Sequence, residues 1–228
     1  MICVMGLLLK ISIVLIAFAG QIDCSQQIAN KPKTEKRMEN TESNNLPKLE
    51  VSLISTETTL EVEYKVKNST NSTIYLFNVL LDPDAVDKVA PYSFYSCLRQ
   101  DKTLILAKMI PKLPSIATVE FREIPYVTKV EAGKEFSRKE TVALPVEEFS
   151  PYFPKGENSK VDIRTSERAI FTIQFIREKE GLEVKETNIS DAYSVWHKDL
   201  FGSVETITSK EKMISVKVNK RLDAFEEF

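Results

Sequence analysis

The chain has 228 residues, of which 43% are hydrophobic, and its 31 basic and 33 acidic residues leave a formal net charge of −2 at pH 7. A charge this close to zero argues against broad nucleic-acid binding, which relies on an excess of Lys and Arg. The hydrophobic content is ordinary for a globular domain, and three cysteines are too few for a disulfide-rich scaffold. We therefore expect a domain stabilised mainly by an apolar core.

The first nineteen residues have the pattern of an export signal. Lys10 is their single charge, residues 11–18 are almost entirely apolar, and residues 17–19 read Ala-Phe-Ala before the expected cleavage site. Two alternatives stay open: an uncleaved anchor, although the apolar run is short and interrupted by Lys10, and a lipoprotein attached through Cys24. The favoured interpretation is a cleaved signal peptide at residues 1–19. It predicts a secreted or periplasmic protein with no membrane span after cleavage.

Residues 20–46 have few large apolar side chains and are rich in Lys, Glu, Asn, Ser and Thr. Such a segment cannot bury enough apolar surface to offset the entropy lost on ordering, so we expect a disordered polar tether. Residues 47–228 show no internal repeat and are expected to form a single domain. Cys24 and Cys97 could pair as a disulfide or remain separate thiols, and the sequence leaves both possibilities open.

The predicted domain begins with a candidate strand at residues 49–54 and continues into a hairpin. At residues 60–67, apolar side chains alternate with Glu and Lys, which is the pattern of a strand with one face in solvent. Residues 68–72 have turn composition, and residues 74–81 form an apolar run rich in β-forming residues. The return strand of this hairpin is therefore expected to be more deeply buried than the outgoing strand.

Further short strands are predicted along the rest of the chain, with one break for a helix. A short helix is the favoured interpretation of residues 191–200, with Asp191 as N-cap and Gly202 as stop. The predicted strands lie at residues 103–109, 117–121, 126–130, 142–144, 171–175, 182–185 and 214–218. Nine or ten short strands with at most one helix predict an all-β fold, specifically an antiparallel immunoglobulin-like β-sandwich.

The sequence contains no catalytic or metal-binding signature. The one histidine, His197, lies between Trp196 and Lys198, and we expect it at the surface beside a packed tryptophan. One histidine and two cysteines outside the signal provide too few ligands for a tetrahedral zinc site. The acidic stretch at residues 82–87 lacks the spacing of an EF-hand, and we interpret it as a solvated turn. No cofactor and no metal are therefore predicted.

Three glycosylation sequons begin at Asn68, Asn71 and Asn188. They matter only in a host that glycosylates its exported proteins. The low cysteine content favours a bacterial envelope, where we expect these segments to be polar turns.

Aromatic residues beside prolines are the most distinctive feature of the predicted domain. They occur at residues 91–95, 125–126 and 151–154, which are segments expected at the ends of strands. Exposed aromatic side chains there would form a binding surface, whereas buried ones would close the ends of the core. The candidate binding residues are Tyr92, Tyr95, Tyr152 and Phe153.

These features predict a non-catalytic exported protein that binds a protein or glycan partner at the cell envelope. Its partner and its oligomeric state cannot be read from the sequence. The alternative is an envelope hydrolase that uses paired acidic residues, since any two of the 33 acids could converge in the fold. A cleft with two carboxyl groups about 5 to 10 Å apart would favour the hydrolase.

Overall fold

The computed structural model describes residues 46–82, 88–90, 93–113, 122–153 and 159–222, all of which belong to one unit, Asn40–Phe228. The expected signal peptide and most of the expected tether, and therefore Cys24, lie outside the described residues. So do the predicted strand at residues 117–121 and most of the acidic stretch at residues 82–87. No helix in the described part of the chain is both long enough and apolar enough to cross a membrane.

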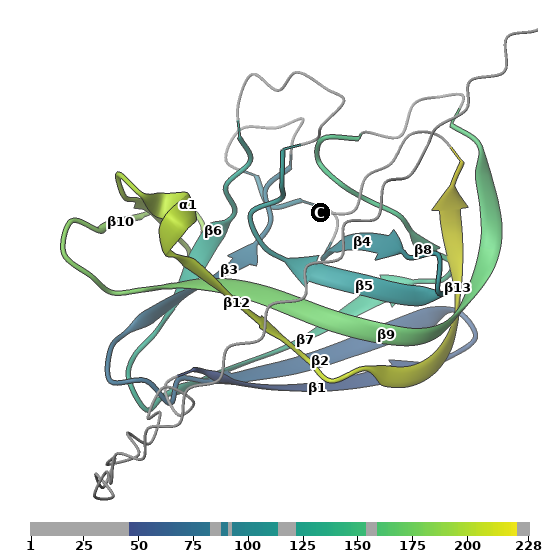
Figure 1. Cartoon of the computed structure of the whole chain (residues 1–228), viewed down its shortest axis with the longest axis horizontal. Helices are drawn as coiled ribbons and strands as arrows, with labels where there is room; N and C mark the ends of the chain where they lie inside the picture. The colour runs from purple at the N-terminus through teal and green to yellow at the C-terminus, as the bar shows by residue number, and fades with distance from the viewer. Residues whose placement is uncertain (1–45, 83–87, 91–92, 114–121, 154–158, 223–228) are drawn as a thin grey trace, which may run out of the picture. The chain divides into compact units, whose positions relative to one another are not determined.

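The described residues include thirteen strands and one short helix (Figure 1). The predicted all-β sandwich with one short helix is confirmed, with more strands than expected. In chain order the strands are β1 (Lys48–Ser55), β2 (Thr59–Lys67), β3 (Ile74–Val79), β4 (Tyr95–Leu98), β5 (Thr103–Lys108), β6 (Tyr126–Val130), β7 (Glu135–Ala143), β8 (Val146–Glu147), β9 (Val161–Arg177), β10 (Glu183–Glu186), β11 (Tyr193–Trp196), β12 (Val204–Thr208) and β13 (Lys212–Arg221); the helix is α1 (Leu200–Ser203).

The strands form two sheets that pack face to face. The smaller sheet has the order β1-β2-β7, and in Figure 1 its strands run side by side below the long strand β9. The larger sheet has ten strands, with β10-β11-β6-β3-β9-β13-β8 as its main path and β4, β5 and β12 joined to it through β9. Apolar side chains of β2, β5 and β9 meet between the sheets in the largest core cluster.

The two strands predicted within residues 60–81 are present as β2 and β3, but the prediction that they pair as a hairpin is wrong. β2 lies between β1 and β7 in the smaller sheet, and β3 lies between β6 and β9 in the larger sheet. In β2, Leu60, Val62, Tyr64 and Val66 are fully buried, as their alternation with charged residues predicts. All six residues of β3 are buried. Both faces of β3 are covered because two smaller core clusters lie on the outer side of the larger sheet, under the loops and under β10, β11 and α1. A run of continuous hydrophobicity is the expected sequence of such a strand.

The prediction of a purely antiparallel arrangement is wrong for two strand pairs. β5 runs parallel to β9, with Ile105 opposite Ile170, and β13 runs parallel to β8. Parallel neighbours need a long connection, and the chain passes through β6, β7 and β8 before β9 returns beside β5. Local alternation reports which face of a strand is buried, but it carries no information about the direction of the neighbouring strand.

The short helix lies at Leu200–Ser203 and not at residues 191–200. Four residues in the middle of the expected helix form strand β11, which pairs with β10 so that Val195 lies opposite Val184. Asp191 has a positive φ of 58° and belongs to the turn that joins these two strands. The buried residues Ala192 and Val195 fit a helix and a strand almost equally well, and the hairpin with β10 decides in favour of the strand.

Candidate functional site

The predicted aromatic surface is not assembled as a single exposed patch. Tyr92 lies outside the described residues. Tyr95 is only 2% exposed and packs against Phe149, with ring centroids 5.9 Å apart, so in this fold it closes the core as the alternative interpretation expected. Tyr152 and Phe153 are half-buried, and the Tyr152 hydroxyl accepts a hydrogen bond of 2.9 Å from the backbone N–H of Glu123. Burial raises the pKa of both Tyr152 and Glu123.

Hollows in the surface lie instead on two sides of the turn at Leu144 and Pro145, which are joined by a cis peptide bond. The first, which we call the apolar groove, has a volume of about 400 Å³. Its walls come from β4, β5, β8 and the segment just before β4 on one side, and from β7 and the following turn on the other. Apolar side chains dominate the lining, among them Phe94, Leu106 and Val142. The groove therefore opens between the two sheets.

Polar groups at the edge of the apolar groove are held in place by hydrogen bonds. The Ser96 hydroxyl donates to the backbone carbonyl of Glu147 at 2.5 Å, and the Glu147 carboxylate accepts from the side chain of Asn219 at 2.6 Å. Thr141 is exposed and also lines the groove. An apolar floor with a few fixed polar groups is the usual composition of a ligand pocket.

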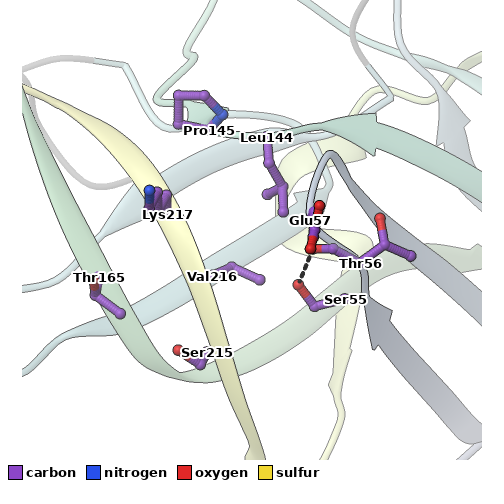
Figure 2. Close-up of a pocket in the computed structure, with 9 residues that line it drawn as sticks. All are labelled: Ser55, Thr56, Glu57, Leu144, Pro145, Thr165, Ser215, Val216 and Lys217. Carbon is purple, nitrogen blue, oxygen red and sulfur yellow. Dashed lines mark hydrogen bonds between the residues drawn. The ribbon is translucent and has the colours of Figure 1, made fainter.

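The second hollow, which we call the polar pocket, has a volume of about 480 Å³ (Figure 2). Figure 2 shows the turn at residues 55–57 on one side, and Thr165 with residues 215–217 of β13 on the other. The Thr56 hydroxyl fixes this turn by accepting a hydrogen bond of 3.0 Å from the backbone N–H of Thr59. Four hydroxyl side chains line the pocket, together with one carboxylate, Glu57, and one ammonium, Lys217.

His197 and Trp196 have the opposite environments from those predicted. His197 is only 7% exposed, whereas Trp196 is 59% exposed. Trp196 is the last residue of β11 and His197 follows it, so their side chains point to opposite sides of the strand. The side shared by Val195 and His197 faces the core. His197 Nδ1 accepts a hydrogen bond of 3.0 Å from the backbone N–H of Asp199. That contact assigns the histidine to a structural role in the turn before α1.

One aromatic contact at the surface has no counterpart in the sequence prediction. The guanidinium of Arg122 lies 3.7 Å from the ring centroid of Phe201, which is 49% exposed. The two residues are far apart in sequence and carry no joint motif, so only the folded chain brings them together.

The sequons divide according to their burial. Asn68 is fully buried, its side-chain amide donates to the carbonyls of Ser72 and Val130, and its side-chain oxygen accepts from Thr70. Asn68 is therefore a turn residue, as expected, and the folded chain does not offer it to a glycosyltransferase. Asn71 and Asn188 are exposed.

Metal ligands do not gather in the described part of the chain, where no group of three or more His, Cys, Asp or Glu side chains is arranged to hold an ion. Comparison with known proteins finds no relative: no family model, no curated protein and no solved structure matches this chain. The two hollows beside Leu144 and Pro145 are therefore the candidate site on physical grounds alone.

Proposed function

We propose that this protein is an exported, non-catalytic binding protein that holds a protein or glycan partner at the cell envelope through the hollows beside Leu144 and Pro145. The observation that carries the proposal is the apolar groove between the two sheets, with Phe94 and Leu106 in its floor and Glu147 at its edge. Its volume is within the range of small ligand pockets, about 300 to 1,000 Å³. A groove of this size accommodates one or two side chains of a bound segment, or a sugar ring.

The distribution of carboxylates supports binding over hydrolysis. Glu147 is the one carboxylate that lines the apolar groove as described, and Glu57 is the one that lines the polar pocket. A glycoside hydrolase with paired acids needs two carboxyl groups across one cleft. Neighbouring Glu148 is buried and accepts hydrogen bonds from the backbone N–H groups of Leu98 and Arg221, which gives it a structural role.

The experiment is capture of an envelope component by the immobilised mature chain, with a variant that obstructs the groove. Thr141→Arg places a long charged side chain at the exposed edge of the groove, and we expect it to reduce capture at least tenfold. Ser137→Arg is the matched control, because Ser137 is exposed on the same strand and is not among the residues that line the groove. We expect this control to bind like the wild type.

Equal capture by all three proteins would contradict the assignment of the groove. Release of soluble sugar from purified envelope glycan, if Glu147→Gln abolished it, would instead support the hydrolase. Export is a separate part of the proposal and rests on residues 1–19. N-terminal sequencing of the exported chain is expected to find Gly20 first, and a chain that still begins at Met1 would contradict a cleaved signal.

A further inference from the structure

A lysine and a glutamate are buried together between the two sheets. Lys108 Nζ lies 3.0 Å from Oε1 of Glu140, and their side chains are only 3% and 8% exposed. The same nitrogen donates a hydrogen bond of 2.9 Å to the backbone carbonyl of Asn78. It also lies 4.9 Å from the ring centroid of Phe94 and 5.9 Å from that of Tyr64. An ammonium in this position has lost nearly all contact with solvent.

The fold explains why Asn78 and Lys108 meet although they are 30 residues apart in sequence. β3 and β5 both pair with β9: Leu76 lies opposite Phe175, and Lys108 lies opposite Ile173. The two strands therefore approach each other along β9. β3 stops pairing with β9 after Leu76, and Lys108 satisfies the carbonyl of Asn78 at this junction.

All four polar side chains of this region point toward the space between the sheets. Leu106 in β5 belongs to the central core cluster, and Lys108 follows it by two residues on the same face. Asn78 lies at a register shift of β3, and its side chain is near the Tyr64 hydroxyl. Tyr64 belongs to the same cluster. Glu140 reaches it from β7, where Arg138 Nε lies 2.9 Å from the Glu140 Oε1 atom.

Much of the hydrogen-bonding capacity of this cluster is unused. Within the described part of the chain, the Tyr64 hydroxyl, both polar atoms of the Asn78 carboxamide and Oε2 of Glu140 are buried without a hydrogen-bond partner. Each such group has lost its hydrogen bonds to water without gaining one in the protein, which destabilises the fold. A purely structural ion pair between Lys108 and Glu140 would not require a carboxamide here, since an apolar side chain at position 78 would avoid that cost.

We propose that Lys108 and Asn78 condense to form an intramolecular amide bond that joins β5 to β3, with Glu140 transferring the protons. The Lys108 Nζ attacks Cγ of Asn78, so that the Nζ–Cγ bond forms and the Cγ–Nδ2 bond breaks. Glu140 first accepts a proton from the ammonium and then delivers it to the departing nitrogen, which leaves as ammonia. The carboxylate that this regenerates accepts the second proton that Nζ loses on becoming the amide nitrogen, so Glu140 ends protonated. The reaction involves no oxidation and needs no co-reactant.

The environment of Lys108 suits each step. Burial lowers the pKa of Lys108 to about 8, against the opposing effect of Glu140, and so favours the neutral amine with its nucleophilic lone pair. The aromatic rings of Phe94 and Tyr64 shield the amine from water, which protects the product from hydrolysis. Lys108 Nζ already contacts the backbone carbonyl oxygen of Asn78. The side-chain carbon Cγ of the same residue is only four bonds from that oxygen, so a change of side-chain rotamer brings Cγ toward Nζ.

The mass of the denatured mature chain tests this proposal. Loss of ammonia is expected to leave the wild type about 17 Da lighter than its sequence requires. A proteolytic digest should then contain one branched species in which the peptides of Asn78 and Lys108 are joined. Glu140→Gln keeps the size of the side chain but does not accept the proton, and we expect it to have the full mass. Lys102→Met removes an exposed lysine just before β5, and this control should keep the loss.

The digest of the wild type decides the matter even if a variant fails to fold. Recovery of Asn78 and Lys108 in separate, unmodified peptides would overturn the proposal. Ammonia lost elsewhere, for example by ring closure at an N-terminal glutamine, would leave these two peptides unlinked and would overturn it equally.

Discussion

Adjacent residues of β2 occupy opposite environments. Val66 is fully buried between the sheets, whereas Lys67 is exposed. In the register of the smaller sheet, Val66 lies opposite Leu49 on one side and Phe136 on the other. Successive side chains of a strand point to opposite faces. How much a side chain contributes to the stability of the fold therefore depends on which face of β2 it occupies.

Val66→Asp is expected to lower the free energy of unfolding by several kcal/mol, because it buries a carboxylate that has no partner at this position. Lys67→Ala, one residue away on the solvent face, is expected to change it by less than about 0.5 kcal/mol. Urea denaturation of the two variants beside the wild type measures both values. Similar losses of stability from both substitutions would show that the wrong face of β2 has been assigned to the core.

At the scale of the strands, the sequence predicts a strand well where one of its faces is exposed to solvent. The alternation in residues 60–67 identifies β2 because charged side chains mark its solvent face. It does not identify β4 or β8, which are four and two residues long and too short to show a period. It misassigns β11 as part of a helix because the hairpin with β10, rather than local propensity, determines its conformation.

The candidate sites are less predictable than the strands because they depend on contacts between distant segments. The apolar groove combines Phe94 and Leu106 with Val142, which belong to different sheets. Lys108, Asn78 and Glu140 likewise come from three separate strands. No local pattern marks Lys108, Asn78 or Glu140, since a lone Lys or Glu in a strand normally indicates a solvent-facing position. The aromatic segments do indicate one part of the groove, because Phe94 lies within residues 91–95.

At the scale of the whole molecule, the described residues from Leu46 onward contain three hydrophobic clusters. Every residue of the three hydrophobic clusters lies between Leu49 and Val218. At the start of the described chain, the backbone carbonyl of Leu46 accepts a hydrogen bond of 2.8 Å from the Ser69 hydroxyl. A chain that begins at Leu46 thus retains both the described core and this contact.

We expect a chain beginning at Leu46 to unfold within about 2 °C of the mature chain when both are heated in the presence of a reductant, because the removed segment is polar in sequence and has few large apolar side chains to bury. Circular dichroism measures both midpoints, and the same pair is then heated without reductant. A higher midpoint for the mature chain only without reductant would show that Cys24 pairs with Cys97, since a disulfide closing a loop of about 70 residues contributes roughly 4 kcal/mol. A higher midpoint that persists in reductant would show that residues before Leu46 pack against the domain, and the tether would then be part of the fold.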